Sequence, residues 1–77
     1  MSAQMDRLRE NARAALLNLQ DIQERQRGLR DAVNRHYISP KDAGWLDPYL
    51  RWHEGQARIE LGRFVAPILL AGELVDL

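Results

Sequence analysis

Apolar residues recur at alternating intervals of three and four residues along the first half of the chain. This spacing puts one side chain per turn on the same face of a helix. The positions are Met5, Leu8, Ala12, Ala15, Leu19, Ile22, Gln26, Leu29, Val33 and His36, and eight of the ten are apolar. Gly28 could end the helix early, because glycine costs about 1 kcal/mol relative to alanine, but the spacing keeps its phase beyond it. The pattern therefore predicts one continuous helix over about residues 3–36.

The next segment, residues 37–47, carries the signals of a chain reversal. Ser39 and Asp47 each precede a proline, an arrangement that resembles an N-cap followed by proline in the first helical position. Two helix starts so close together predict a short corner helix, ended near Gly44, before a long return helix begins.

The second half of the chain again shows helical spacing, which predicts a return helix over about residues 48–66. Pro67 lacks the N–H that a helix interior needs, so we expect a kink there and then a short apolar helix over about residues 67–76. The fold class is therefore all-α, an antiparallel helical hairpin. If Val33 lies beside Leu50, the antiparallel register predicts that Gln26 meets Ala57 and that Ile22 meets Leu61.

More apolar side chains are present than a single seam between two helices can cover. Leu16, Leu17, Leu69, Leu70 and Leu74 belong to this surplus. A contiguous exposed apolar patch usually marks an interface, so we expect a second polypeptide to cover it. An identical subunit would give a homodimer with a completed helical bundle, and a different protein is the alternative.

An aromatic group lies at the predicted corner, where Trp45, Tyr49 and Trp52 are spaced i, i+4, i+7 with Arg51 among them. Tryptophan, tyrosine and arginine often dominate the binding energy of interfaces, whereas large rings also close the end of a helical core. We expect a mixed outcome, in which Trp45 packs inward and Tyr49 with Trp52 faces outward at least in part.

Residues with catalytic or metal-binding chemistry are sparse. Ser2 and Ser39 are the only serines, cysteine and threonine are absent, and no glycine-rich phosphate loop occurs. We therefore expect no enzymatic activity and no cofactor. His36, His53 and Glu54 alone suggest a metal, and the two histidines lack the i, i+4 spacing of helical ligands, although the reversal could bring them together.

The charge balance bears on the possible partners. Eleven basic residues match eleven acidic ones, which disfavours nucleic acid as a partner. The longest uncharged run, Phe64 to Gly72, is far shorter than the roughly 18 to 20 residues that span a bilayer, so no membrane span is expected. Charged residues near the N-terminus interrupt any signal-peptide pattern, so a cytoplasmic location is expected.

Three classes of function fit these observations. The leading hypothesis is a small non-enzymatic protein-interaction module, such as an adaptor, a chaperone-like partner or an inhibitor of another protein. The second is a nucleic-acid-binding regulator that uses the arginine-rich first helix as a dimer, although the acidic residues interspersed there oppose it. The third is a structural component of a larger assembly.

Overall fold

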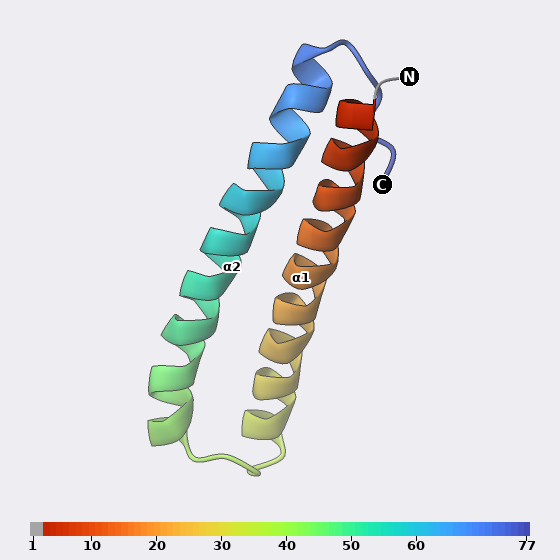
Figure 1. Ribbon diagram of the computed structural model, residues 1–77. Coiled ribbons are helices and arrows are strands. Elements are labelled where there is room, and N and C mark those ends of the chain that lie inside the picture. Colours follow the sequence, from red (N-terminus) through yellow and green to blue (C-terminus); the bar gives the residue numbers. More distant parts are fainter. Residues whose placement is uncertain (1–2) are drawn as a thin grey trace.

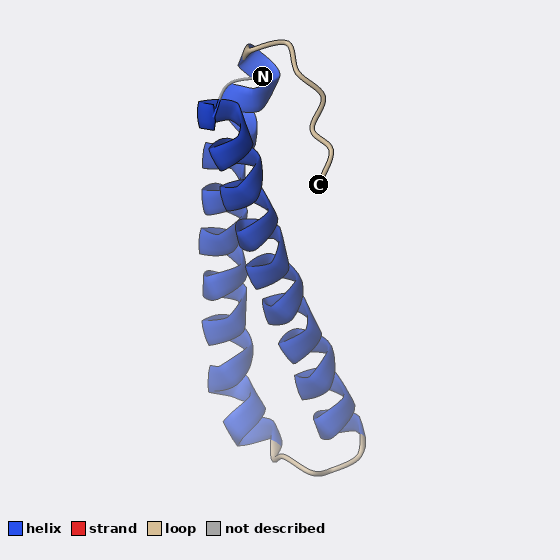
Figure 2. Ribbon diagram, turned by 45° about the vertical axis from the view of Figure 1, so that its right-hand side comes forward, coloured by secondary structure: helices blue, strands red, loops and turns tan. Residues whose placement is uncertain are grey.

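Two antiparallel helices make up most of the structure, a computed structural model that describes residues 3–77 (Figure 1). Helix α1 spans Ala3–Asn34 and helix α2 spans Pro40–Leu70, and the described residues contain no strand. The helices lie side by side as a rod of 52 × 16 × 15 Å. Residues 71–77, which follow α2, turn back along the rod (Figure 2). The predicted all-α helical hairpin is confirmed.

Helix α1 runs without interruption through Gly28, as the phase of its apolar residues predicts. It ends in a Schellman motif, in which the Tyr37 N–H donates to the Ala32 carbonyl at 2.8 Å and the His36 N–H to the Val33 carbonyl at 3.1 Å. His36 has a φ of 61°, the left-handed conformation that glycine usually supplies at this position.

Ser39 caps α2, because its Oγ accepts a hydrogen bond from the Asp42 N–H at 3.2 Å. The second helix start expected at Asp47 is wrong, and so is the separate corner helix over residues 37–47: α2 continues through Pro48, and the reversal takes only residues 35–39. If the helix broke at Pro48, up to four backbone N–H groups and four carbonyl groups would lack helical partners. A proline within a continuous helix removes only one hydrogen bond, here to the carbonyl of the exposed Gly44.

The C-terminal end of α2 also differs from the prediction. The helix continues through Pro67 for one turn to Leu70, and the separate helix expected over residues 67–76 does not form. Gly72 explains the stop, since its φ of 76° ends α2 with a second Schellman motif, in which the Glu73 N–H donates to the Ile68 carbonyl at 3.2 Å. The chain after Gly72 therefore turns back instead of extending the rod.

The buried interior is small and lies along the line between the two helices. Leu19 and Ile22 of α1 cluster with Ala57 of α2, and Leu61 packs against this group. Leu61 packs against the group that contains its expected partner Ile22, whereas Ala57 lies in this cluster about one turn nearer the start of α1 than its expected partner Gln26. The shorter reversal causes this shift, because α2 begins earlier. The buried residues are Ala12, Ala15, Leu19, Ile22, Ala57 and Ile68.

Replacing Ile68 with alanine tests the importance of this seam. Ile68 is fully buried, so we expect the free energy of unfolding to fall by about 2–5 kcal/mol. Urea denaturation followed by circular dichroism measures the change. Leu17→Ala is the control, because Leu17 is 65% exposed and its truncation should change stability by no more than about 0.5 kcal/mol. Similar losses in the two variants would show that the seam does not hold the hairpin together.

Replacing His36 with glycine tests the strain at the end of α1. Because a side chain disfavours the left-handed conformation, His36→Gly should raise the free energy of unfolding by about 1 kcal/mol. Asn34→Gly, two residues earlier in the helix, should lower it by up to about 1 kcal/mol. If both glycines destabilise the protein in urea denaturation, the turn is not built as described.

Candidate protein-interaction surface

The three aromatic residues singled out at the predicted corner lie together on α2, on the side turned away from α1. Trp45 is 60%, Tyr49 54% and Trp52 60% exposed. The outward placement of Tyr49 and Trp52 agrees with the prediction, whereas the inward packing expected for Trp45 is wrong. Since α2 is continuous across Pro48, all three rings share one helical face at the spacing i, i+4, i+7.

The same spacing continues along the whole outer side of α2. We call the following set the outer stripe: Trp45, Tyr49, Trp52, Gln56, Ile59, Arg63, Ala66 and Leu70. Its members alternate at intervals of four and three residues, and all of them are exposed. The opposite side of the helix, with Ala57 and Ile68, faces α1. Helix α2 thus carries apolar side chains on two faces, of which the hairpin covers one.

His53 orders the aromatic end of the outer stripe. Its half-buried ring lies edge-to-face against Tyr49, with ring centroids 4.4 Å apart, and against Trp52, at 5.0 Å. Such contacts restrict the rotation of both outer rings. The aromatic surface is therefore partly organised before any partner binds.

Arg51, the fourth residue predicted at this corner, points to another side of α2. Its guanidinium pairs with the carboxylate of Asp47 at 2.9 Å. Asp47, which was expected to cap a helix, therefore forms an ion pair within α2 instead. Arg51 is not brought to the outer stripe.

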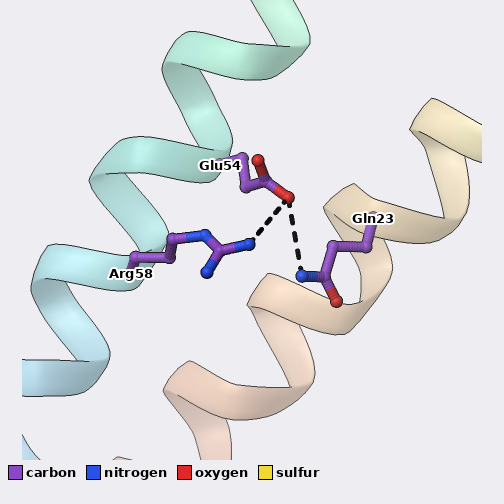
Figure 3. Close-up of polar contacts among 3 residues, drawn as sticks. All are labelled: Gln23, Glu54 and Arg58. Atoms are coloured by element: carbon purple, nitrogen blue, oxygen red, sulfur yellow. Dashed lines mark hydrogen bonds and ion pairs between the residues drawn. The ribbon is translucent and has the colours of Figure 1, made fainter.

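A polar contact links the two helices beside the seam (Figure 3). The Glu54 carboxylate accepts a hydrogen bond from the Gln23 side chain of α1 at 3.5 Å and pairs with Arg58 of its own helix at 3.4 Å. This contact agrees with the register of the apolar seam and lies on a different side of α2 from the aromatic rings. It leaves the outer stripe free of internal polar contacts to α1.

The five leucines predicted at an interface fall into separate places. Leu70, 88% exposed, ends the outer stripe, and Leu69 lies beside it. Leu16 is half-buried and Leu17 exposed on α1, where both line a shallow pocket with Leu77. Leu74 lies in the C-terminal segment and is 83% exposed. The leucines therefore form no single patch. Ile59, an apolar residue that the predicted interface residues do not include, belongs to the outer stripe by its heptad spacing.

Arg9 holds the C-terminal segment against α1. Its guanidinium donates to the Leu74 carbonyl at 3.1 Å and pairs with the Glu73 carboxylate at 3.5 Å, and only 15% of its side chain is exposed. Nothing in the spacing of the sequence indicates this contact, because it depends on the turn at Gly72.

The residues considered for metal binding lie apart. His36 is in the reversal, whereas His53 lies thirteen residues, about 20 Å of helix, beyond the start of α2. Within residues 3–77, no group of three or more His, Cys, Asp or Glu side chains is placed to hold a metal ion. Neither of the two described helices is long and apolar enough to cross a membrane.

Comparisons with protein-family models, with curated proteins and with solved structures gave no match. The function must therefore be inferred from the residues of this chain and their geometry.

Replacing Arg9 with alanine should release the C-terminal segment. We expect backbone NMR order parameters of residues 73–77 to fall, while the free energy of unfolding changes by less than about 1 kcal/mol, because the partner carboxylate of Glu73 is 45% exposed and residues 73–77 add nothing to the buried core. Arg13→Ala is the matched control, since Arg13 lines the same groove as Arg9 and Glu73. Unchanged order parameters in Arg9→Ala would contradict a fastening role.

Proposed function

We propose that this chain is a non-enzymatic protein-interaction module that binds another polypeptide through the outer stripe of α2. The observation that carries the proposal is the exposure of Trp45, Tyr49 and Trp52 on one face of a regular helix. Aromatic side chains of this kind commonly anchor protein interfaces, and a helix face with heptad spacing is a common binding element. An adaptor or an inhibitor of another protein would use such a face.

The total surface of the chain supports the proposal. A compact protein of 8.9 kDa exposes about 4,800 Å², whereas this hairpin exposes 5922 Å². The excess arises because each helix of the rod has one neighbour within the chain. The exposed apolar residues of the outer stripe form part of this surface, and apolar residues gathered on one face are typical of a binding site.

The arginines of α1 give little support to the nucleic-acid alternative. Arg25 pairs with Asp21 at 3.0 Å and Arg35 with Asp31 at 3.1 Å. These acidic partners offset the positive potential that phosphate contacts need. The outer stripe itself holds one charged residue, Arg63.

Replacing Trp45 and Trp52 together with alanine tests the proposed function. The tagged protein should retain a partner from a lysate of its source cells, and the double variant should lose that partner while its circular dichroism spectrum stays unchanged, because both rings are 60% exposed.

Tyr37→Ala is the matched control. Tyr37 is an aromatic residue that is 76% exposed but lies in the reversal, outside the outer stripe, so its loss should leave binding intact. Equal capture by the double variant and the original protein would contradict the proposal, and a loss of helicity would assign the tryptophans to the fold instead.

A further inference from the structure

We propose that the partner of the outer stripe is a second copy of this chain, bound antiparallel about a twofold axis that passes between the two α2 helices at the level of Ala57 and Arg58. This inference rests on the proposed function and names its partner. In the resulting assembly the two α2 helices pack together at the centre, and each α1 lies on the outside. The product is a four-helix arrangement in which both apolar faces of α2 are covered.

The area available matches what a stable dimer needs. Each subunit of a standard interface buries about 800 Å², and the exposed surface of this chain exceeds that of a compact protein of its mass by about 1,100 Å². The outer stripe runs from Trp45 to Leu70, which at 1.5 Å per residue is about 38 Å of continuous helix. A second α2 of equal length can therefore cover the whole stripe.

Antiparallel pairing about this axis gives the charged member of the stripe an aromatic partner and sets its largest side chains against smaller ones. Trp52 meets Arg63 of the partner subunit, an aromatic face against a guanidinium, which is a favourable cation–π pair. The other pairs join Trp45 with Leu70 of the partner subunit, Tyr49 with Ala66 of the partner subunit, and Gln56 with Ile59 of the partner subunit. Large side chains meet smaller ones, as interdigitated packing prefers.

The charge of Arg63 decides between the two possible directions. In a parallel dimer each residue of the stripe would face its own copy, so Arg63 would lie against Arg63 of the partner subunit inside an apolar seam. That pairing buries two like charges without compensation, which is strongly unfavourable. The antiparallel direction separates the two arginines and gives each an aromatic neighbour.

Two glycines beside the stripe fit a close approach of the second helix. A Cβ built at Gly55 or Gly62 has no heavy atom within 4 Å, so the hairpin itself gives no reason for their small size. Each glycine costs about 1 kcal/mol relative to alanine in the middle of a helix. In the proposed dimer Gly55 lies diagonally across from Gly62 of the partner subunit on one flank of the seam, offset by two residues or about 3 Å along the helix, where the lack of side chains lets the backbones come together.

The flank on the other side of the stripe brings an imidazole near a carboxylate. His53 lies diagonally across from Glu60 of the partner subunit, offset by two residues along the helix, and both residues are on the described surface of α2. The symmetric assembly therefore contains this pair twice. Shifting the register by one heptad would instead place His53 against His53 of the partner subunit.

Molar mass and charge reversal provide the first test. Multi-angle light scattering at concentrations up to about 1 mM should give twice 8.9 kDa for the original protein. Arg63→Glu puts a carboxylate against the face of Trp52 in each of the two symmetric pairs and should raise the dimer dissociation constant about tenfold or more. Arg27→Glu makes the same charge change on the exposed side of α1 and should leave the constant unchanged.

Alanine at the glycines provides a test in which stability and association change in opposite directions. Gly62→Ala should raise the thermal stability of the hairpin measured at high dilution and weaken dimerisation, because the new methyl group lies in the seam between the two copies. Gly28→Ala on α1 also has open space around its Cβ, and it should raise stability without affecting dimerisation.

Distances between spin labels test the direction of pairing. The chain has no cysteine, so Lys41→Cys and Arg58→Cys each carry one label per subunit. The antiparallel dimer should separate the labels at position 41 by about 50 Å and those at position 58 by less than about 30 Å. A short distance at both positions would show a parallel dimer and overturn the inference.

The outcomes separate this inference from the proposed function. A monomer at every concentration that still captures another protein through Trp45 and Trp52 overturns the second copy as partner and leaves the proposed function standing. A dimer insensitive to both Arg63→Glu and Gly62→Ala uses another face, which also overturns the inference. A monomer that captures no protein through the outer stripe would overturn both this inference and the proposed function.

Discussion

The contact of Leu19 and Ile22 with Ala57, continued by Ile68, is the apolar interior on which the described part of the chain depends. Three of the six buried residues are alanines, so the helices pack closely but bury little area per residue. A domain this small has little stability to spare. The contact between the helices also determines what stays exposed, because a hairpin covers one side of each helix and leaves the other to solvent.

The two helices use that outer side differently. The outer side of α1 carries charged residues, several of them in ion pairs along the helix, such as Asp21 with Arg25. The outer side of α2 carries aromatic and aliphatic residues, and beside them lie Gly55 and Gly62, at which an added Cβ would meet no atom of the hairpin within 4 Å. Neither feature stabilises an exposed helix. The glycines lower the stability of the helix, and the exposed apolar residues increase its tendency to associate. Binding to another helix accounts for both, which is why α2 is the element proposed to meet a partner.

The heptad of α1 and the cap at Ser39 could be predicted because both depend on residues near each other in the sequence. The continuity of α2 through Pro48 and Pro67 could not, since local proline rules favour a break, whereas the cost of leaving a helix end unpaired depends on the whole element. Because of that error, the prediction made the reversal too long, placed the two helices about one turn out of register and expected Trp45 to pack inward. The ion pair between Arg9 and Glu73 could not be predicted from the sequence either, because it depends on the turn at Gly72.

Polar residues within an apolar stripe have a definite physical effect. Gln56 and Arg63 reduce the affinity that a purely apolar face would offer, and a hairpin without them would associate with many apolar surfaces. The same two residues restrict the arrangements that remain, because a charge in a seam is tolerated only opposite a suitable neighbour. In the proposed dimer the apolar side chains supply the driving force, while the arginine selects the direction and the glycines set the distance of approach. The specificity of the surface then depends on its least apolar members.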